Sequence, residues 1–153
     1  MELKEKTREE STEWLAEMWV SYRHALLDAG MSEEAADQNI ERNRSQILDG
    51  DALVEGHYVL DVMSDGETVG TLWLSQSSPQ QPGEWYVYDV VVHEAYRGKG
   101  LGRQTMLAAE EFVTAHGGTR LALNVFGPNR VARSLYESMD YQVRAIGMFK
   151  DLA

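Results

Sequence analysis

The sequence contains no cysteine and no long hydrophobic run. The absence of Cys among its 153 residues excludes disulfides, thiol catalysis and cysteine-ligated metal sites. No apolar stretch approaches the roughly 20 residues that a membrane-spanning helix needs, so no membrane partner is expected. Residues 1–10 are a charged mixture without the apolar core of a secretory signal. These absences predict a soluble, reduced protein with a cytoplasmic location.

Two common catalytic patterns are also missing. His24, His57, His93 and His116 form no H-x-x-x-H or H-E-x-x-H pair, so no metal site is expected. No G-x-S-x-G nucleophile elbow occurs. For any group transfer, direct attack by the acceptor is therefore preferred over a covalent enzyme intermediate.

Basic residues are scarce, and the formal net charge is −11. Residues 1–100 hold 20 acidic and 8 basic side chains, a net −12, whereas residues 101–153 carry a net +1. Nucleic-acid binding needs clustered Lys and Arg, so nucleic acid is not expected as a partner. The acidic part would attract a cationic ligand, and the last third could receive a phosphorylated one. Surface acids that only maintain solubility are an equally good interpretation.

Length and composition favour one globular domain over residues 1–153, because a chain of this size can bury a single core. Apolar periodicity predicts two N-terminal helices, and later a helix with Leu107, Ala108 and Phe112 facing inward. Predicted helices span 7–30, 32–49, 103–116 and 128–139; predicted strands span 3–7, 57–63, 68–74, 85–92, 121–125 and 141–150, with a loop at 77–83. This order predicts an α/β (α+β) domain with a mixed central sheet flanked by helices. Residues 85–125 should form a right-handed parallel strand–helix–strand unit.

Aromatic residues on the first helix allow two interpretations. Trp14 and Tyr22 lie on its apolar stripe, whereas Trp19 lies off the stripe and is expected to be more exposed. Packing in the core is one interpretation, and the wall of a ligand pocket is the other. The same two interpretations apply to Trp85, Tyr86 and Tyr88 on the predicted central strand.

A glycine-rich turn, Arg97-Gly98-Lys99-Gly100-Leu101-Gly102, separates strand 85–92 from the following helix. Glycines let backbone N–H groups approach a ligand closely, and a helix N-terminus attracts anions. Arg103 and the two bases of the turn add full positive charges. The segment lacks the spacing of a Walker loop or of a dinucleotide fingerprint. It predicts a pyrophosphate site, with a tight turn carrying solvated bases as the alternative.

A second motif lies at Asn124–Tyr141, which reads N-V-F-G-P-N-R-V-A-R-S-L-Y-E-S-M-D-Y. With the glycine-rich turn, this segment resembles the GCN5-related N-acetyltransferase (GNAT) superfamily. The family's loop [QR]-x-x-G-x-[GA] is matched by residues 97–102, and its N-x-x-A-x-x-L-Y-x-x-x-G-[FY] pattern is matched at Asn129, Ala132, Leu135, Tyr136 and Tyr141. The family's final glycine is Asp140 here, a residue that tolerates a left-handed turn. The resemblance covers about residues 57–150 and implies the GNAT fold.

The resemblance implies acetyl-CoA as cosubstrate, without a metal. Its pantetheine arm would pair with the strand backbone like an added strand, and its pyrophosphate would meet the loop amides. Asn129 would hydrogen-bond the pantetheine arm, with a helix N-cap as the alternative or additional role. Tyr136 would protonate the departing thiolate, with a core tyrosine as the alternative. The cofactor-binding residues so implied are Val90, Val91, Val92, Arg97, Gly98, Lys99, Gly100, Leu101, Gly102, Arg103, Asn129 and Tyr136.

The residues alone do not identify the general base. An amine must lose a proton before it attacks a thioester, and some family members place a glutamate at the position of Asn124, which cannot accept one. Asp89 is the candidate taken here, with Glu84 and His93 as alternatives on or beside the same strand. Ordered water ending at backbone carbonyls would serve equally well, and Asp89 could be structural.

These interpretations predict direct transfer of an acetyl group from acetyl-CoA to an amine, with a cationic acceptor favoured by the acidic residues. The main alternative is an acyl-CoA sensor without catalysis, which the presence of Tyr136 disfavours. An unrelated nucleotide-binding domain is disfavoured by the motif that begins at Asn129. An exposed final strand or sheet edge could pair two subunits, and the resemblance is consistent with a homodimer.

Overall fold

The computed structural model describes residues 1–76 and 81–152; positions 77–80 of the predicted loop, and 153, lie outside the described residues. The chain divides into two compact units, residues 1–122 and 123–153, each of which is described by itself. The elements are β1 (Glu2–Glu5), α1 (Arg8–Asp28), α2 (Glu33–Ile47), β2 (Leu48–Asp49), β3 (Ala52–Leu53), β4 (His57–Ser64), β5 (Glu67–Gln76), β6 (Glu84–Val92), η1 (Glu94–Tyr96), α3 (Leu101–Ala115), β7 (Arg120–Leu123) and α4 (Arg130–Glu137).

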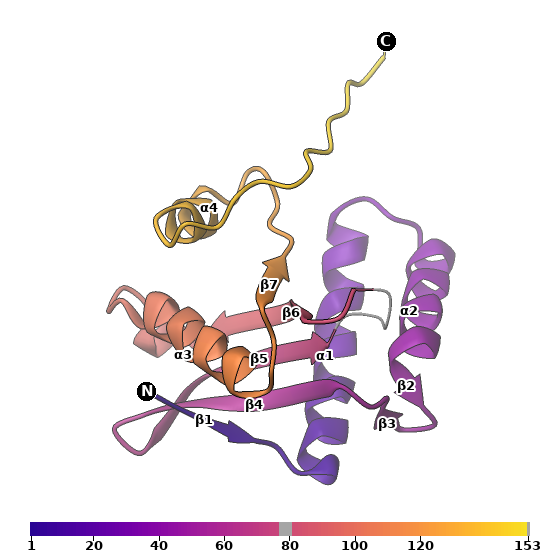
Figure 1. The fold of residues 1–153 in the computed structure, drawn as a ribbon. Coiled ribbons are helices and arrows are strands. Elements are labelled where there is room, and N and C mark those ends of the chain that lie inside the picture. Colours follow the sequence, from indigo (N-terminus) through magenta and orange to yellow (C-terminus); the bar gives the residue numbers. More distant parts are fainter. Residues whose placement is uncertain (77–80, 153) are drawn as a thin grey trace. The chain divides into compact units, whose positions relative to one another are not determined.

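A five-stranded sheet in the order β1-β4-β5-β6-β7 forms the centre of the fold (Figure 1). The first four strands pair antiparallel. The carbonyl of Gly83 accepts hydrogen bonds from the amides of Thr119 at 2.7 Å and Arg120 at 3.1 Å. Strands β6 and β7 therefore begin side by side and run in the same direction. The predicted mixed sheet flanked by helices is confirmed.

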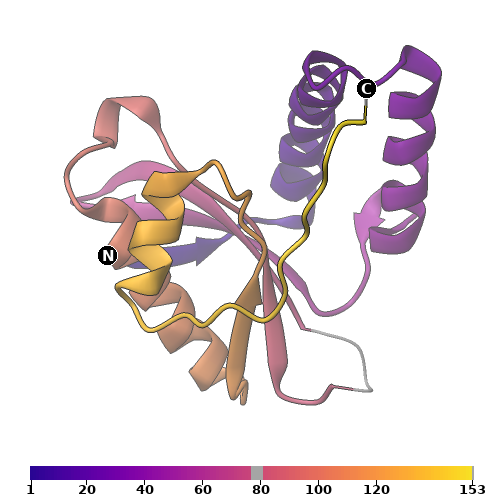
Figure 2. The ribbon, with the colours of Figure 1, turned by 90° about the horizontal axis from the view of Figure 1, so that it is seen from above.

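Helices α1 and α2 cover one face of the sheet (Figure 2). Leu15 and Ile47 from these helices form a buried cluster with Val59 and Trp73 of the sheet. The two helices begin where their caps predict: α1 has a complete capping box at Thr7, and the Ser32 side chain accepts a hydrogen bond from the third residue after it. Local sequence thus sets the helix starts, and the apolar cluster fixes both helices on the sheet.

Helix α3 covers the opposite face, because neighbouring residues of a strand point to opposite sides. Tyr58, next to Val59, contacts the ring of Phe112 on α3 at 5.4 Å. The buried side chains of α3 are Thr105, Met106, Ala109 and Val113. The prediction that Leu107 faces inward is wrong, since its side chain is 46% exposed. Its position is rotated by about 100° from Met106 around the helix, which takes it off the inner stripe.

Trp19 also differs from its prediction. It packs, partly buried, against the α1–α2 cluster instead of standing exposed. Its ring lies 6.2 Å from that of Tyr22, and its indole Nε1 is buried without a hydrogen-bond partner among the described residues. The apolar stripe of a helix between a sheet and a second helix is wider than the narrow stripe that the spacing suggested.

The second unit contains α4 and the chain end. The predicted strand 141–150 is wrong, because the described residues 141–152 form neither helix nor strand. Their apolar side chains stand exposed, Phe149 at 91%. Alternating apolar residues favour a strand only when a neighbouring strand satisfies the backbone and packs the side chains. The five-stranded sheet does not include this segment.

Candidate active site

A β-bulge in β6 places two neighbouring side chains on one face of the sheet. Trp73 pairs with Asp89, but the next residue of β5, Leu74, pairs with Val87. Tyr88 is therefore the extra residue, and the pleat changes phase there. The ring of Tyr88 stacks on that of Trp73 at 4.8 Å, and Asp89 lies directly opposite Trp73. Both residues thus belong to the face covered by α1 and α2.

Beyond the bulge, the last residues of β6 form an edge. Strand β7 has four residues and starts beside Gly83, so it accompanies only about the first half of β6. The backbone amide of His93 donates to the carbonyl of Val69 on β5, so alternation turns the backbone groups of Val92 and Val90 away from β5. The carbonyl of Val92 accepts a hydrogen bond from Arg97 Nε at 3.0 Å. This is the edge predicted to pair with an extended ligand.

The glycine-rich loop leads from this edge into α3. Gly98 and Gly100 both have φ of +75°, and Gly100 is the N-cap of α3 without a side-chain cap. The first amides of α3 are therefore left for solvent or a ligand. A Cβ at either glycine would meet nothing within 4 Å, so glycine is needed for the left-handed backbone and not for space. An exposed, positively charged helix N-terminus results.

Two hydrogen bonds hold the start of this loop to the neighbouring hairpin. The backbone amide of His93 donates to the carbonyl of Val69 at 2.9 Å. The Tyr96 hydroxyl donates to a Glu67 carboxylate oxygen at 2.7 Å, which raises the pKa of Tyr96. The Lys99 ammonium lies over the same ring, 5.6 Å from its centroid. Both bonds lie on the strand side of the loop, just before Arg97.

An aromatic cluster lies on the same face as Asp89. Trp73 stands edge-on to Trp14 at 5.7 Å, and the ring of His57 lies 5.9 Å from Trp73 and 5.2 Å from Tyr88. Trp73 donates its indole N–H to His57 Nδ1 at 3.1 Å. Trp73 is buried, whereas Tyr88 is 45% exposed. The cluster is therefore buried at Trp73 and open to solvent on the side of Tyr88.

Asp89 is distinguished from the other candidate bases by its surroundings. Burial raises the pKa of its carboxyl, and a hydrogen bond from the backbone of Val90 opposes that shift in part. Glu84 is only 8% exposed and pairs with Arg120 at 3.5 Å. It lies eight residues before Val92, roughly 26 Å along the strand. His93 is exposed at the strand end. Of the three, Asp89 is the partly buried group that directly precedes the open edge at Val90.

Asn129 and Tyr136 belong to the second unit. The Asn129 side chain accepts a hydrogen bond from the Ala132 amide at 3.2 Å, so its predicted N-cap role is confirmed. Its NH2 group is not used in that bond. The Tyr136 ring contacts that of Tyr141 at 5.7 Å. Asp140 has φ of +64°, the left-handed conformation expected where the family has glycine.

Three features of the site were missed by sequence reasoning: the bulge, the Trp73–His57 hydrogen bond and the Tyr96–Glu67 tie. The two bonded pairs are 16 and 29 residues apart, and only sheet register brings them together. The single available signal was the high aromatic content of the strands, which carries no pairing information.

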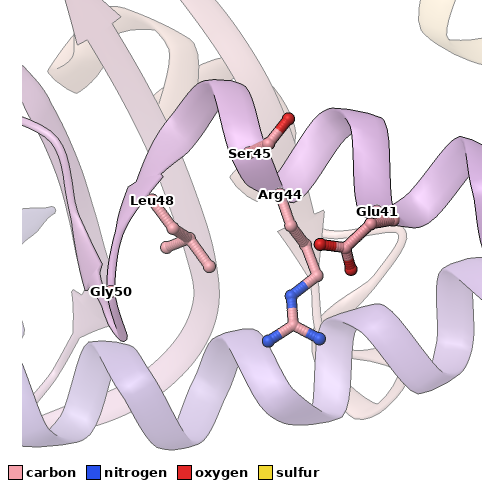
Figure 3. A pocket seen from close by; sticks show the side chains of 5 residues that line it. All are labelled: Glu41, Arg44, Ser45, Leu48 and Gly50. Atoms are coloured by element: carbon pink, nitrogen blue, oxygen red, sulfur yellow. The ribbon is translucent and has the colours of Figure 1, made fainter.

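A shallow hollow of about 200 Å³ lies elsewhere, at the end of α2 (Figure 3). It is lined by Glu41, Arg44, Ser45, Leu48 and Gly50. None of the predicted site residues lines it. In residues 1–76 and 81–152, no cluster of His, Asp and Glu could hold a metal ion. No helix in that same part of the chain is long and apolar enough to cross a membrane.

Comparison with known proteins identifies the family. The sequence model of the acetyltransferase (GNAT) family matches residues 11–141. The chain belongs to this family. It is 37% identical over 97 residues to YdgE of Bacillus subtilis, named an uncharacterized N-acetyltransferase, covering 63% of this chain and 62% of YdgE. It is 35% identical over 86 residues to the N-alpha-acetyltransferase RimI of Mycobacterium tuberculosis, covering 56% and 52%. The chain thus spans less than two thirds of the length of the curated relatives it matches.

Solved structures agree with this assignment. The crystal structure of YycN from Bacillus subtilis, named an uncharacterized N-acetyltransferase, superposes with a TM-score of 0.84 at 28% identity, covering 99% of this chain and 98% of YycN. An aminoglycoside 6'-N-acetyltransferase from Acinetobacter haemolyticus superposes with a TM-score of 0.55 at 14% identity, covering 100% of each chain. The second likeness shows the fold alone. The predicted GNAT family and fold are confirmed.

Proposed function

We propose that this GNAT protein is an acetyl-CoA-dependent N-acetyltransferase that acetylates an amine directly. The observation that carries the proposal is the uncapped N-terminus of α3 beside the unaccompanied end of β6. Amides and bases at the loop suit a pyrophosphate, and the strand edge suits an extended amide-containing arm. The end of β6 leads along the chain into the loop before α3, so a single extended ligand can contact both.

In this proposal the cofactor supplies an acetyl thioester, and the protein positions it and moves protons. The residues 97–103 hold the pyrophosphate, and Val90–Val92 pair with the pantetheine arm. Asn129 adds a hydrogen bond to that arm through its NH2 group, which capping leaves available. The fit rests on the left-handed backbone at the two glycines, which shapes the loop, and on the open space beside them.

Asp89 is proposed to accept the proton that the acceptor ammonium must lose. Its raised pKa supports this role, because a base works best when its pKa approaches the working pH. The neutral amine then attacks the thioester carbonyl, an amide C–N bond forms and the C–S bond breaks, and the nitrogen releases its remaining extra proton to solvent. The Tyr136 hydroxyl donates its proton to the departing thiolate. The acidic charge of residues 1–100 supports a cationic acceptor.

We further propose that residues 1–153 act as one N-acetyltransferase domain. The family match from residue 11 to residue 141 covers parts of both compact units, which supports this reading. A homodimer and a cytoplasmic location stay predictions.

Titration calorimetry with acetyl-CoA and CoA tests the cofactor site. We expect micromolar binding by the wild type and its loss in Gly100→Glu, which places a carboxylate at the N-terminus of α3. Gly30→Glu is the matched control, because Gly30 also has positive φ and open space but lies at the end of α1. Wild-type protein that binds neither ligand would contradict the proposal.

A thiol-release assay with a panel of amines separates the enzyme from a sensor. Tyr136→Phe should keep its affinity for CoA and lose about 100-fold or more in kcat, the usual contribution of a proton donor. Equal turnover by Tyr136→Phe would remove the general-acid role. Cofactor binding without turnover of any amine would favour the sensor.

A further inference from the structure

We propose that Tyr88 is a specificity-determining residue: the open side of its ring holds the acceptor ammonium by cation–π attraction, beside the carboxylate of Asp89. The substrate class is then an alkylamine that arrives as a cation, in preference to an amine that is uncharged at neutral pH. This inference rests on the proposed function, and its test separates failure of the one from failure of the other.

The bulge in β6 allows Tyr88 and Asp89 to act on the same group. Neighbouring side chains of a regular strand point to opposite faces of the sheet. Here Trp73 pairs with Asp89 and Leu74 with Val87, so Tyr88 is the extra residue. Its ring stacks on that of Trp73 and therefore lies on the face to which Asp89 belongs. The Cα atoms of Tyr88 and Asp89 are about 3.8 Å apart, with no strand between them.

Stacking on Trp73 covers one face of the Tyr88 ring. The two ring planes meet at 26° with their centroids 4.8 Å apart. Tyr86 stands edge-on to Tyr88 at 5.3 Å, which limits rotation of the ring. Tyr88 is nevertheless 45% exposed, whereas Trp73 beneath it is 4% exposed. The exposed part of the Tyr88 ring is therefore the side turned away from Trp73.

Asp89 has no cation of its own. The residue is half-buried, and no basic side chain in residues 1–76 and 81–152 forms an ion pair with it. A charge removed from water without a partner is costly. An ammonium beside Tyr88 would supply the missing positive charge, and the ring face attracts a cation within about 6 Å of its centroid. The carboxylate and the ring thus favour the same ligand.

The position also suits the proposed transfer. Val90–Val92, the edge proposed to pair with the cofactor, directly follow Asp89 in β6, and Tyr88 directly precedes it. An amine held between Tyr88 and Asp89 would therefore meet the thioester at Asp89. An uncharged amine gains neither the ion pair nor the cation–π contact. We expect the site to discriminate between amines by their charge.

The test compares propylamine, a cation at neutral pH, with trifluoroethylamine, which its electron-withdrawing fluorines keep uncharged. Tyr88→Leu should lower the ratio of their kcat/KM values by about 2- to 30-fold, the range of one cation–π contact. The loss should come from a higher KM for propylamine, with KM for acetyl-CoA unchanged. Tyr88→Phe keeps the ring and should keep the ratio. Phe149→Leu, which removes an exposed aromatic ring outside the candidate site, is the matched control.

Taking the ratio within each variant cancels a general loss of active protein. An unchanged ratio in folded Tyr88→Leu would overturn the role of Tyr88 and leave the proposed function standing. If Tyr88→Leu does not fold, Tyr88→Thr gives the same measurement with a β-branched residue that suits a strand. Wild-type protein that prefers trifluoroethylamine, or that binds acetyl-CoA and acetylates neither amine, would overturn the substrate class. Absence of acetyl-CoA binding would instead overturn the proposed function.

Discussion

The Tyr96 hydroxyl and the Glu67 carboxylate share a 2.7 Å hydrogen bond that joins the glycine-rich loop to the turn between β4 and β5. The Lys99 ammonium lies over the same tyrosine ring. A hairpin residue that makes no ligand contact of its own can therefore orient a charge of the loop. Such ordering before ligand arrival reduces the entropy that binding must remove.

Removing the Tyr96–Glu67 hydrogen bond should weaken cofactor binding without slowing the chemical step. We expect Tyr96→Phe to raise KM for acetyl-CoA by about 2- to 10-fold, the range of one hydrogen bond to a charged group at the surface, with kcat nearly constant. Glu67→Gln should give a similar, smaller change. Tyr96→Leu, which also removes the ring beneath Lys99, should exceed both. Steady-state kinetics with varied acetyl-CoA would contradict this role if all three variants matched the wild type.

Asp89 should make stability depend on pH. Its pKa is raised by burial from 3.8, so the folded state holds this proton more tightly than the unfolded state does. The free energy of unfolding contributed by Asp89 then falls as pH rises from about 4 through the folded pKa. Asp89→Asn removes this loss, so it should be more stabilising, relative to wild type, at pH 7 than at pH 4. Urea unfolding at the two pH values measures it, with Asp28→Asn as an exposed control.

Gly70 allows β5 and β6 to approach at the edge that precedes the loop. An added Cβ would overlap the carbonyl oxygen of Val91, and both strands are held there by their ladder. Gly70→Ala should therefore cost about 1–3 kcal/mol of folding free energy. Gly127→Ala, where an added Cβ meets nothing within 4 Å, is the control. Equal midpoints of denaturant unfolding for both variants would refute this account.

Asp140 closes α4 in a left-handed conformation. The amide of Tyr141 donates to the carbonyl of Tyr136 at 3.0 Å and that of Asp140 to Glu137 at 3.2 Å, the bonding pattern of a Schellman motif. Since glycine adopts this conformation more easily, Asp140→Gly should stabilise the end of α4 by up to roughly 1 kcal/mol. Amide hydrogen exchange there should therefore be slower. Faster exchange would show that the carboxylate stabilises the turn.

Features set by short-range rules could be predicted from the sequence. The caps at Thr7 and Ser32, the end of α1 before Gly30 and the turn at Asp140 each depend on residues within one helical turn. The position of the glycine-rich loop between a strand and a helix follows from the same local signals. The family pattern then connected the loop with Asn129 and Tyr136.

Features that depend on distant partners could not be predicted. The segment 141–150 has strand-like alternation, but alternation does not supply the neighbouring strand that pairing needs. The burial of Trp19 depends on the sheet and on α2 closing over the first helix. The Trp73–His57 hydrogen bond requires a register that a one-residue slip would destroy, since such a slip turns every side chain to the other face.

Because Tyr88 is an extra residue, the alternation of side chains between the two faces of the sheet is shifted by one residue in the second half of β6. Before it, Trp85 and Val87 face α3 and fill the core; after it, Asp89 faces the opposite layer. Deleting one residue there would not shorten a loop but would exchange the faces of one half of the strand. Either the two core side chains would turn toward α1 and α2, or the carboxylate would turn into the packing beneath α3. A β6 with one residue fewer could keep its core or its candidate base, but not both.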